Sequence, residues 1–458
     1  MKLLTENRLD ELLNKQKHFF DSHQTKDISF RRKSLKKLLH AINENEEEIA
    51  SCLKKDLNKS YEEAYLTEIS LVKTEIKFHL KHLAKWTRAK RVPTPIYLLP
   101  SRSRIQYEPL GVALVIAPWN YPFQLLFSPL VGVLSSGCCA ILKPSPDSPH
   151  TALLMEKIIN EIFEENHIAV VHGAKTENQL LFKKRFDHIF FTGSSKLGKI
   201  VMKAAAEFLT PVVLELGGKS PCIVDEDANL NICAKRIAWS KSINAGQTCI
   251  APDYILVHEK VKEELIKKIA ENWVDMFGEN PINSSYYPRI VHQMAFDRIN
   301  SLLSNGEIRS GGQTDREKLY IAPSIIDQIT IEDPIMKEEI FGPILPILSF
   351  SDINSALHII QNFEKPLALY YYGSPKKAKS ILRKSSSGGV CINDGLIHIV
   401  NHHLPFGGVG HSGTGSYHGY QSFLCFSNAK AIVQSPTWID LPFKYVPFKW
   451  FKWIKKIV

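Results

Sequence analysis

The chain has 458 residues, which exceeds the usual limit of a single hydrophobic core, so two or three domains are expected. Hydrophobic residues make up 44% and charged residues 23%, an ordinary globular composition that excludes disordered, collagen-like and membrane-embedded classes. The formal net charge is +10, but much of the lysine excess lies near the carboxyl terminus, and no long basic face is evident. A nucleic-acid partner is therefore not expected.

Cysteine usage and the amino terminus bear on the cellular compartment. The eight cysteines lack the dense, even spacing of a disulfide framework and form no CxxC metal pair. Glu6, Asp10 and Glu11 occupy positions where a secretory signal would need an uninterrupted apolar run. Both observations predict a cytoplasmic location.

The first ninety residues have a helical pattern, with Leu35, Leu38, Leu39 and Ile42 at helical spacing. Prolines from Pro93 onward break this pattern and predict an extended arm that includes residues 103–107.

Residues 125–142 form an uncharged run of the minimum length for a membrane-spanning helix. Pro129, Gly132 and Gly137 interrupt the run. It therefore predicts a buried helix followed by a short strand that ends at Lys143, as in a covered parallel sheet.

From residue 110 onward, short apolar runs alternate with helical patterns. The runs span residues 110–117, 138–142, 167–171, 188–191 and 212–214. A second alternating block covers residues 220–392. This pattern predicts an α/β protein with two doubly wound parallel sheets, whose ligands bind beyond the carboxyl ends of the strands.

Six ordered motifs follow these strands and helices. They are APWNYPF (117–123), FTGSSKLG (191–198), LELGGKSP (214–221), NAGQTCIAPDY (244–254), KEEIFGPILP (337–346) and LPFGGVGHSGTGSYHG (404–419). Through them, residues 30–435 resemble the aldehyde dehydrogenase superfamily. The short amino terminus and the SYHG segment look most like the class 3, or fatty aldehyde, branch.

The resemblance implies that Cys249 is the nucleophile. Gly246, Gln247 and Thr248 place it in a polar segment rich in turn residues. A thiolate that attacks an aldehyde gives a thiohemiacetal, so the oxidation divides into hydride transfer and thioester hydrolysis. The other seven cysteines are expected to be inert.

Two further residues complete the implied chemistry. Glu215 follows the apolar run 212–214 and matches the general base that activates water, a role for which partial burial would raise its pKa. Asn120 carries a neutral amide donor and, with the Cys249 backbone N–H, matches the oxyanion hole.

The implied phosphate contact of a dinucleotide lies at the apparent start of a helix. Gly193, Ser194 and Gly198 surround this helix start. The segment does not match the GxGxxG fingerprint, so only the preceding strand, the following helix and the resemblance support it.

The resemblance also implies contacts with both riboses of NAD or NADP. Lys143 matches the contact with the adenosine ribose, and Glu339 matches the contact with the nicotinamide ribose, with Phe341 packed nearby. Many relatives that prefer NAD have an acidic residue three positions after this lysine, where this chain has Pro146. We therefore expect dual use of NAD and NADP, because no carboxylate there repels a 2′-phosphate.

Histidines are frequent between His398 and His418, but no ordered zinc-ligand spacing accompanies His402 and His403, so no metal is expected. His398 and the Asn393–Asp394 turn are candidates for substrate contact.

Residues 441–458 form an amphipathic carboxyl-terminal tail. From Pro447 onward, a helix would place its lysines within an arc of about 120° and most of its apolar residues outside this arc. These lysines are Lys449, Lys452, Lys455 and Lys456. Twelve residues are too few to span a bilayer, so the pattern predicts contact with the inner membrane face. The alternative is docking on the partner subunit or on the chain's own domain.

The resemblance divides the chain into a cofactor-binding domain (1–89 and 108–216), a catalytic domain (217–425) and a bridging element (90–107 and 426–440) that pairs two subunits in a homodimer. The implied activity is NAD(P)-dependent oxidation of medium-chain, long-chain or aromatic aldehydes to carboxylic acids. Two alternatives stay open, an acylating dehydrogenase that releases its thioester to another acceptor and a homologue without turnover.

Overall fold

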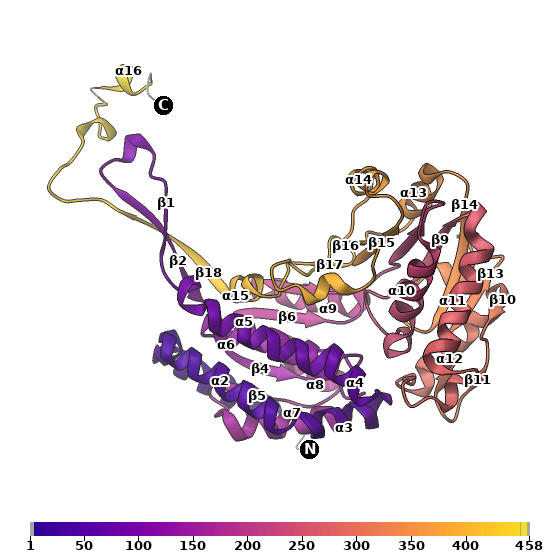
Figure 1. Ribbon diagram of the computed structural model, residues 1–458. Helices are drawn as coiled ribbons and strands as arrows, with labels where there is room; N and C mark the ends of the chain where they lie inside the picture. Colours follow the sequence, from indigo (N-terminus) through magenta and orange to yellow (C-terminus); the bar gives the residue numbers. More distant parts are fainter. Residues whose placement is uncertain (1–3, 449, 456–458) are drawn as a thin grey trace.

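The computed structural model describes residues 4–448 and 450–455 (Figure 1). Helices from the amino-terminal region pack beside a first sheet, a second α/β unit follows, and a narrow arm projects from the body (Figure 1). The predicted α/β class with two sheets is confirmed.

The amino-terminal region is helical, as predicted. Its elements are α1 (Glu6–Asp21), α2 (Ile28–Glu44), α3 (Glu46–Leu57), α4 (Tyr61–Ala64), the π-helical turn η2 (Tyr65–Ile69) and α5 (Ser70–Trp86). Side chains of Thr5, Asp27 and Ser60 accept backbone N–H groups at the starts of α1, α2 and α4, which satisfies donors that a helix leaves unpaired.

The first sheet has the strand order β17-β7-β6-β3-β4-β5. Its strands are β3 (Val112–Ile116), β4 (Cys139–Lys143), β5 (Ile168–Val170), β6 (His188–Thr192), β7 (Val212–Glu215) and β17 (Gly413–Thr414). Its helices are α6 (Pro122–Ser136), α7 (Pro149–Ile162), α8 (Lys175–Phe182) and α9 (Ser195–Ala206). The uncharged run 125–142 forms most of α6, which is buried throughout, and then β4, so that prediction is confirmed.

Both faces of this sheet are covered. Ala113 and Val115 of β3 belong to the core beneath α2, α5, α6 and α7, whereas Leu114 belongs to the core beneath α1 and α9. Successive side chains of a strand point to opposite faces, so a strand covered on both faces is apolar along its whole length.

The second sheet has the order β10-β13-β14-β9-β8-β15-β16. Its strands are β8 (Pro221–Val224), β9 (Tyr254–His258), β10 (Glu307–Ser310), β13 (Ser324–Asp327), β14 (Ile344–Phe350), β15 (Ala368–Tyr372) and β16 (Gly389–Ile392). Its helices are α10 (Leu230–Ser242), α11 (Lys262–Phe277), α12 (Gln293–Asn300), α13 (Ile353–Gln361) and α14 (Pro375–Lys384). A small hairpin of β11 (Thr314–Asp315) and β12 (Tyr320–Ile321) lies between β10 and β13 in the sequence.

The sheets are not wholly parallel, which corrects one detail of the prediction. β17 pairs antiparallel with β7, and β10 pairs antiparallel with β13. Only the small hairpin, and no helix, lies between β10 and β13, and a parallel pair normally needs a helical crossover.

The projecting arm is a third sheet of order β1-β2-β18, formed by β1 (Lys90–Val92), β2 (Arg102–Pro109) and β18 (Ser427–Gln434) (Figure 1). The short helix α15 (Tyr420–Cys425) precedes β18. All eight residues of β18 pair antiparallel with β2, so the predicted extended segment and the segment after the SYHG motif share one sheet.

The tail departs from the predicted helix at its start. Among the described residues from Pro447 onward, α16 (Phe451–Ile454) alone is helical. Phe448 has a φ of 51°, which a right-handed helix excludes, so the helix does not begin at Pro447. Lys449 and residues 456–458 of the predicted helix lie outside the described residues. In residues 4–448 and 450–455, no helix has the length and apolar character needed to cross a membrane.

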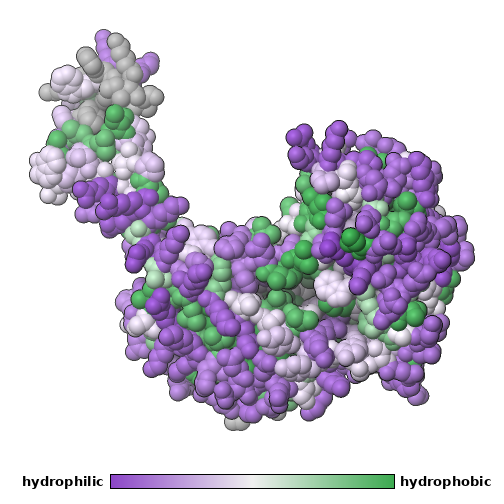
Figure 2. Space-filling model, in the orientation of Figure 1, coloured by the Kyte–Doolittle hydropathy of each residue, from purple (hydrophilic) through white to green (hydrophobic). Residues whose placement is uncertain are grey.

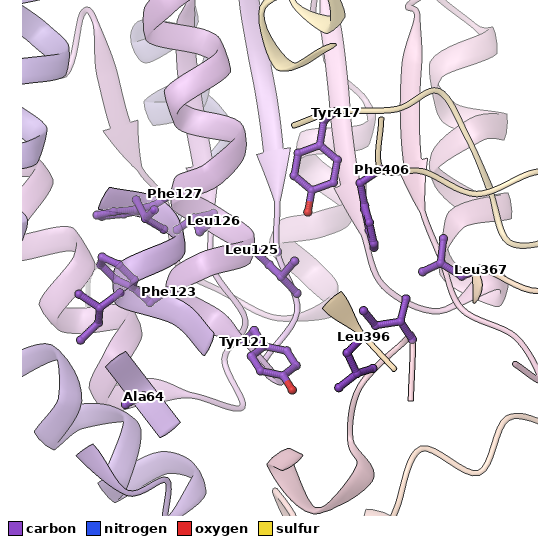
Figure 3. Close-up of a cluster of buried hydrophobic side chains, with 14 of the residues drawn as sticks. Ala64, Tyr121, Phe123, Leu125, Leu126, Phe127, Leu367, Leu396, Phe406 and Tyr417 are labelled. Carbon is purple, nitrogen blue, oxygen red and sulfur yellow. The ribbon is translucent and has the colours of Figure 1, made fainter. Parts of the chain in front are cut away.

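The core around α6 generates a stability prediction. Phe127 is fully buried, and its ring centroid lies 4.7 Å from that of Phe123 (Figure 3). Phe127→Ala should lower the free energy of unfolding by about 3–5 kcal/mol, because a cavity replaces the ring. Urea denaturation monitored by tryptophan fluorescence measures this change.

Leu153→Ala is the matched control, because Leu153 is 45% exposed on the neighbouring helix α7. This variant should stay within about 0.5 kcal/mol of the unmodified protein. Equal losses in the two variants would contradict the packing assigned to Phe127.

Candidate active site

A cavity of about 430 Å³ lies where the amino-terminal helices, the first sheet and the second α/β unit meet. Most of its lining side chains are apolar. They include Leu66, Leu71, Leu125, Trp239, Ile243, Met276, Phe277, Leu396, Ile397, Ile399, Val400 and Phe406. Figure 3 shows Tyr121, Leu396, Phe406 and Tyr417 around this space, and Figure 2 shows apolar side chains gathered in the hollow between the two main parts of the body.

Cys249 lies on the wall of this cavity and is partly exposed. It follows a tight turn in which Asn244, Ala245 and Gly246 all have positive φ angles, of 50°, 51° and 70°. Gly246 is required there, because a Cβ atom would lie 2.2 Å from the carbonyl oxygen of Gly342. The turn therefore directs the next residues, including Cys249, toward the cavity.

The environment of the Cys249 thiol disfavours its charged form. Burial is the largest cause, and the nearby carboxyls of Glu339 and Glu215 act in the same direction, so the pKa of Cys249 is raised. The backbone N–H groups of Cys249 and Ile250 act in the opposite direction, because they stabilise a thiolate.

Glu215 lines the same cavity and is the last residue of β7. Its backbone pairs with Thr192 of β6 and Gly413 of β17, but neither carboxyl oxygen has a hydrogen-bond partner among the described residues. Burial raises the pKa of Glu215 well above its usual value. A buried carboxyl group without a partner is rare, and its position on a cavity wall is typical of functional sites.

Asn120 is buried next to the segment that carries Cys249. Its side-chain Nδ2 donates to the backbone carbonyl of Gln247 at 3.0 Å, and Gln247 lies two residues before Cys249. An amide nitrogen carries two hydrogens, so one remains for another acceptor. The structure thus places Cys249 and Glu215 on one cavity, with Asn120 bonded to the segment that carries Cys249.

Lys143 ends β4, and its ammonium group is buried. It donates to the carbonyls of Gly173 at 2.6 Å and Pro144 at 3.1 Å, and burial lowers its pKa to about 8. Two carbonyl partners leave one of its three hydrogens for another acceptor.

The segment of Gly193, Ser194 and Gly198 forms the amino-terminal end of α9. Ser194 is the exposed N-cap, and its hydroxyl accepts the backbone N–H of Leu197 at 3.4 Å. A Cβ atom on Gly193 would lie 2.6 Å from the ring of Phe191, and one on Gly198 would lie 2.7 Å from Leu216. This close packing brings an open helix terminus, which favours anions such as phosphate, next to the end of the first sheet.

Glu339 and Phe341 approach the same region from the second α/β unit. Glu339 packs against Gly217, and burial raises its pKa to about 8. Phe341 has a φ of 49°, and its ring meets that of Trp119 edge-on at 5.5 Å. The strained backbone at Phe341 is of the kind that clusters at ligand sites.

The hypothesis of substrate contact by His398 or the Asn393–Asp394 turn does not match the cavity lining, which contains the neighbouring residues 396, 397, 399 and 400 instead. The Nδ1 atom of His398 lies 3.2 Å from Cys391 Sγ, and Asn393 accepts the Gly373 N–H. His402 pairs with buried Glu75 at 2.6 Å. The described residues contain no group of three His, Cys, Asp or Glu side chains placed to hold a metal ion.

Most of the cavity wall was missed from the sequence. Trp239 of α10, Met276 and Phe277 of α11, and Tyr286 of the following loop line the cavity, but they lie outside the motifs. No local pattern distinguishes them from other apolar residues, since only the packing of these segments brings them to the site.

Comparison with known proteins agrees with this architecture. The model of the aldehyde dehydrogenase family matches residues 1–432, and the chain belongs to this family. It is therefore an enzyme that oxidises aldehydes with NAD or NADP.

The relatives include members of class 3. The chain is 46% identical to 4,4′-diaponeurosporen-aldehyde dehydrogenase of Staphylococcus aureus, over 98% of this chain and 99% of that protein. It is 42% identical to the dimeric NADP-preferring aldehyde dehydrogenase of Rattus norvegicus, over 92% and 94% of the two chains. The solved structure of a substrate-bound state of Staphylococcus aureus AldH has a TM-score of 0.95 at 45% identity, and it covers 98% of this chain and 99% of that one.

Proposed function

We propose that this enzyme oxidises long, apolar aldehydes to carboxylic acids, with Cys249 as nucleophile, Glu215 as general base and Asn120 as oxyanion donor. The observation that carries the proposal is that Cys249 and Glu215 lie on one largely apolar cavity. Nucleophile and base must reach the same carbonyl carbon, and a shared cavity permits this.

The chemistry proceeds in two stages. The Cys249 sulfur bonds to the aldehyde carbon, the thiol proton leaves to a base, and the carbonyl oxygen becomes an oxyanion that the Asn120 amide and the Cys249 backbone N–H stabilise. Bound NAD or NADP supplies the two-electron acceptor that turns this adduct into a thioester. Glu215 then takes a proton from water, the water oxygen bonds to the thioester carbon, and the carbon–sulfur bond breaks to release the acid and the thiol. The Glu215 carboxyl accepts no hydrogen bond from the described part of the chain, which favours this hydrolysis over release to another acyl acceptor.

The donor set fits a dinucleotide. Lys143 would hold the adenosine ribose, the start of α9 with Gly193, Ser194 and Gly198 the phosphates, and Glu339 the nicotinamide ribose. Pro146 is exposed and carries no charge, so we propose that both NAD and NADP are used. The Rattus norvegicus relative is named NADP-preferring, and a Bacillus cereus relative with 26% identity and a TM-score of 0.85 was solved as an NAD⁺ complex.

The apolar cavity wall supports a hydrophobic substrate. Each methylene that leaves water gains about 0.8 kcal/mol, so a long aliphatic chain binds more tightly than a short one. The name of the Staphylococcus aureus relative, 4,4′-diaponeurosporen-aldehyde dehydrogenase, is consistent with this class of substrate.

The arm and the tail support two contacts. We propose that the arm pairs with a second copy of the chain, because it projects from the body and exposes Ile96, Leu99 and Val433 (Figure 1). The Rattus norvegicus relative is named dimeric. For the tail we propose contact with an anionic membrane, since Trp450 and Phe451 are exposed near several lysines.

Glu215→Gln tests the catalytic assignment. Its kcat should fall by about 10²- to 10⁴-fold, because no base activates the water, while a first-turnover burst of NADH remains. In the unmodified enzyme burial raises the pKa of Glu215, so kcat should fall as the pH drops through this raised value. Stopped-flow absorbance at a series of pH values measures both effects.

Glu226→Gln, at an exposed carboxylate, is the control and should keep kcat and its pH profile. An unchanged kcat in Glu215→Gln would refute the assignment.

A steady-state survey tests the substrate class and the cofactor. We expect kcat/KM to rise from acetaldehyde toward hexadecanal by up to about fourfold per methylene, because each methylene enters the apolar cavity. Benzaldehyde is measured in the same series as the aromatic substrate. The same survey with each cofactor should give kcat/KM values less than about 100-fold apart. A flat response to chain length would exclude the proposed substrate class, and a larger preference for NAD would exclude dual use.

Deletion of residues 447–458 tests the tail. The truncated enzyme should lose binding to vesicles of anionic phospholipid and keep its activity on a soluble aldehyde, because each lysine near such a surface contributes about 1 kcal/mol. Co-sedimentation measures binding, with zwitterionic vesicles as the control.

Light scattering should give a dimer for both the full-length and the truncated enzyme. Undiminished sedimentation would count against membrane contact, and a monomer would favour docking of the tail on the partner subunit.

A further inference from the structure

Lys59 and Glu68 form a fully buried ion pair next to the cavity. The Lys59 Nζ atom lies 2.6 Å from Glu68 Oε1, and both side chains have an exposed fraction of 0%. Lys59 precedes α4, and Glu68 lies in the π-helical turn η2. Removing two charges from water is costly, and apolar residues of similar volume often give equal or greater stability. Fold stability alone therefore does not account for this pair.

The remaining contacts of the pair converge on residues 120–124. Lys59 Nζ donates to the backbone carbonyl of Asn120 at 2.9 Å and lies 4.0 Å from the ring centroid of Tyr121. The second oxygen of Glu68 accepts the backbone N–H groups of Phe123 at 2.9 Å and Gln124 at 3.2 Å.

Glu68 thereby caps α6. The N-cap residue of this helix, Tyr121, makes no side-chain hydrogen bond to it, so the first N–H groups of α6 depend on another acceptor. A carboxylate at a helix amino terminus also interacts favourably with the helix dipole. One ion pair thus holds both the Asn120 carbonyl and the helix that begins two residues later.

A second contact holds Asn120 from the side of Cys249. Asn244 Nδ2 donates to the Asn120 carbonyl at 2.8 Å, and the backbone N–H of Asn244 donates to Glu63 at 2.7 Å. Among the described residues, the loss of Lys59 would leave the Asn120 carbonyl bonded only to Asn244, and the Asn120 side chain would keep its bond to the Gln247 carbonyl. Both contacts come from the turn before Cys249, so the link from Lys59 and Glu68 that sets the Asn120 peptide relative to α6 would be lost.

We propose that Lys59 and Glu68 are positioning residues that fix the Asn120 side chain relative to Cys249. The proposal rests on the role of Asn120 as oxyanion donor in the proposed function. An amide stabilises an oxyanion only when its N–H lies where the negative charge develops. A misplacement of about 1 Å at such a site costs on the order of 100-fold in rate.

A double-mutant cycle tests the proposal. Lys59→Met alone would leave the buried Glu68 carboxylate without its cationic partner and would disturb folding, so the test uses Lys59→Met/Glu68→Gln, in which both side chains are neutral. The kcat of this variant, normalised to the folded fraction, should be about 10- to 100-fold lower, with KM changed by less than about threefold. In an Asn120→Ala background, the same two substitutions should change kcat by less than about twofold, because the amide that they position is gone.

Lys262→Met is the matched control, because Lys262 pairs with buried Asp327 at 2.6 Å in the second α/β unit. This variant should lower the unfolding temperature and keep kcat.

The possible results separate the two proposals. An unchanged kcat in Lys59→Met/Glu68→Gln would overturn the positioning role and leave the proposed function standing. The same conclusion would follow if Asn120→Ala itself lowered kcat and the two substitutions then lowered kcat by the same factor with Asn120 present and with Ala at position 120. An unchanged kcat in Asn120→Ala itself would reject the role of Asn120 in the proposed function and the positioning role with it.

Discussion

Burying a carboxyl group without a hydrogen-bond partner costs free energy, and the proposed site depends on Glu215, whose carboxyl has no such partner among the described residues. Hydrogen bonds fix the backbone of Glu215, whereas its carboxyl group accepts none from the described residues. The carbonyl of Glu215 accepts the N–H of Gly193 at 3.0 Å, and the next residue, Leu216, donates to Ser412 at 3.1 Å. The strand pairing of the first sheet therefore keeps the Glu215 carboxyl at the cavity, and the apolar cores on both faces of the sheet stabilise that arrangement.

The same burial determines the electrostatics of the site. The pKa values of Glu215, Cys249 and Glu339 are all raised, chiefly by desolvation, and the two carboxyls also disfavour a negative charge on the sulfur. An environment that disfavours charge suits an uncharged aldehyde, and in the proposed mechanism charge develops only as the Cys249 sulfur attacks.

The turn before Cys249 shows how the fold supports a strained segment. Asn244 and Ala245 hold left-handed conformations that are costly for residues with a Cβ atom. Buried Gln247 compensates, because its side chain donates to the carbonyls of Asn244 and Arg289 and accepts the N–H of Val291. These bonds connect the turn to a segment more than forty residues away in the sequence, so several contacts fix the backbone conformation before Cys249.

The sequence by itself determined the order of the elements and the family. The run 125–142 showed a buried helix and a strand because apolar periodicity and helix-breaking residues act locally. The motifs around Asn120, Glu215 and Cys249 were recognisable for the same reason, since each occupies a short stretch of chain.

Only the tertiary structure decided what surrounds these motifs. The ion pair of Lys59 and Glu68 reaches Asn120 across 61 residues, and the cavity wall combines Trp239, Phe277 and Leu396 from separate elements. The tail shows the converse, because its lysine periodicity predicted a helix from Pro447, whereas the backbone at Phe448 is left-handed. Periodicity indicates which residues a helix would place on one face. How the whole chain packs decides which distant segments come into contact and which local turns allow that contact.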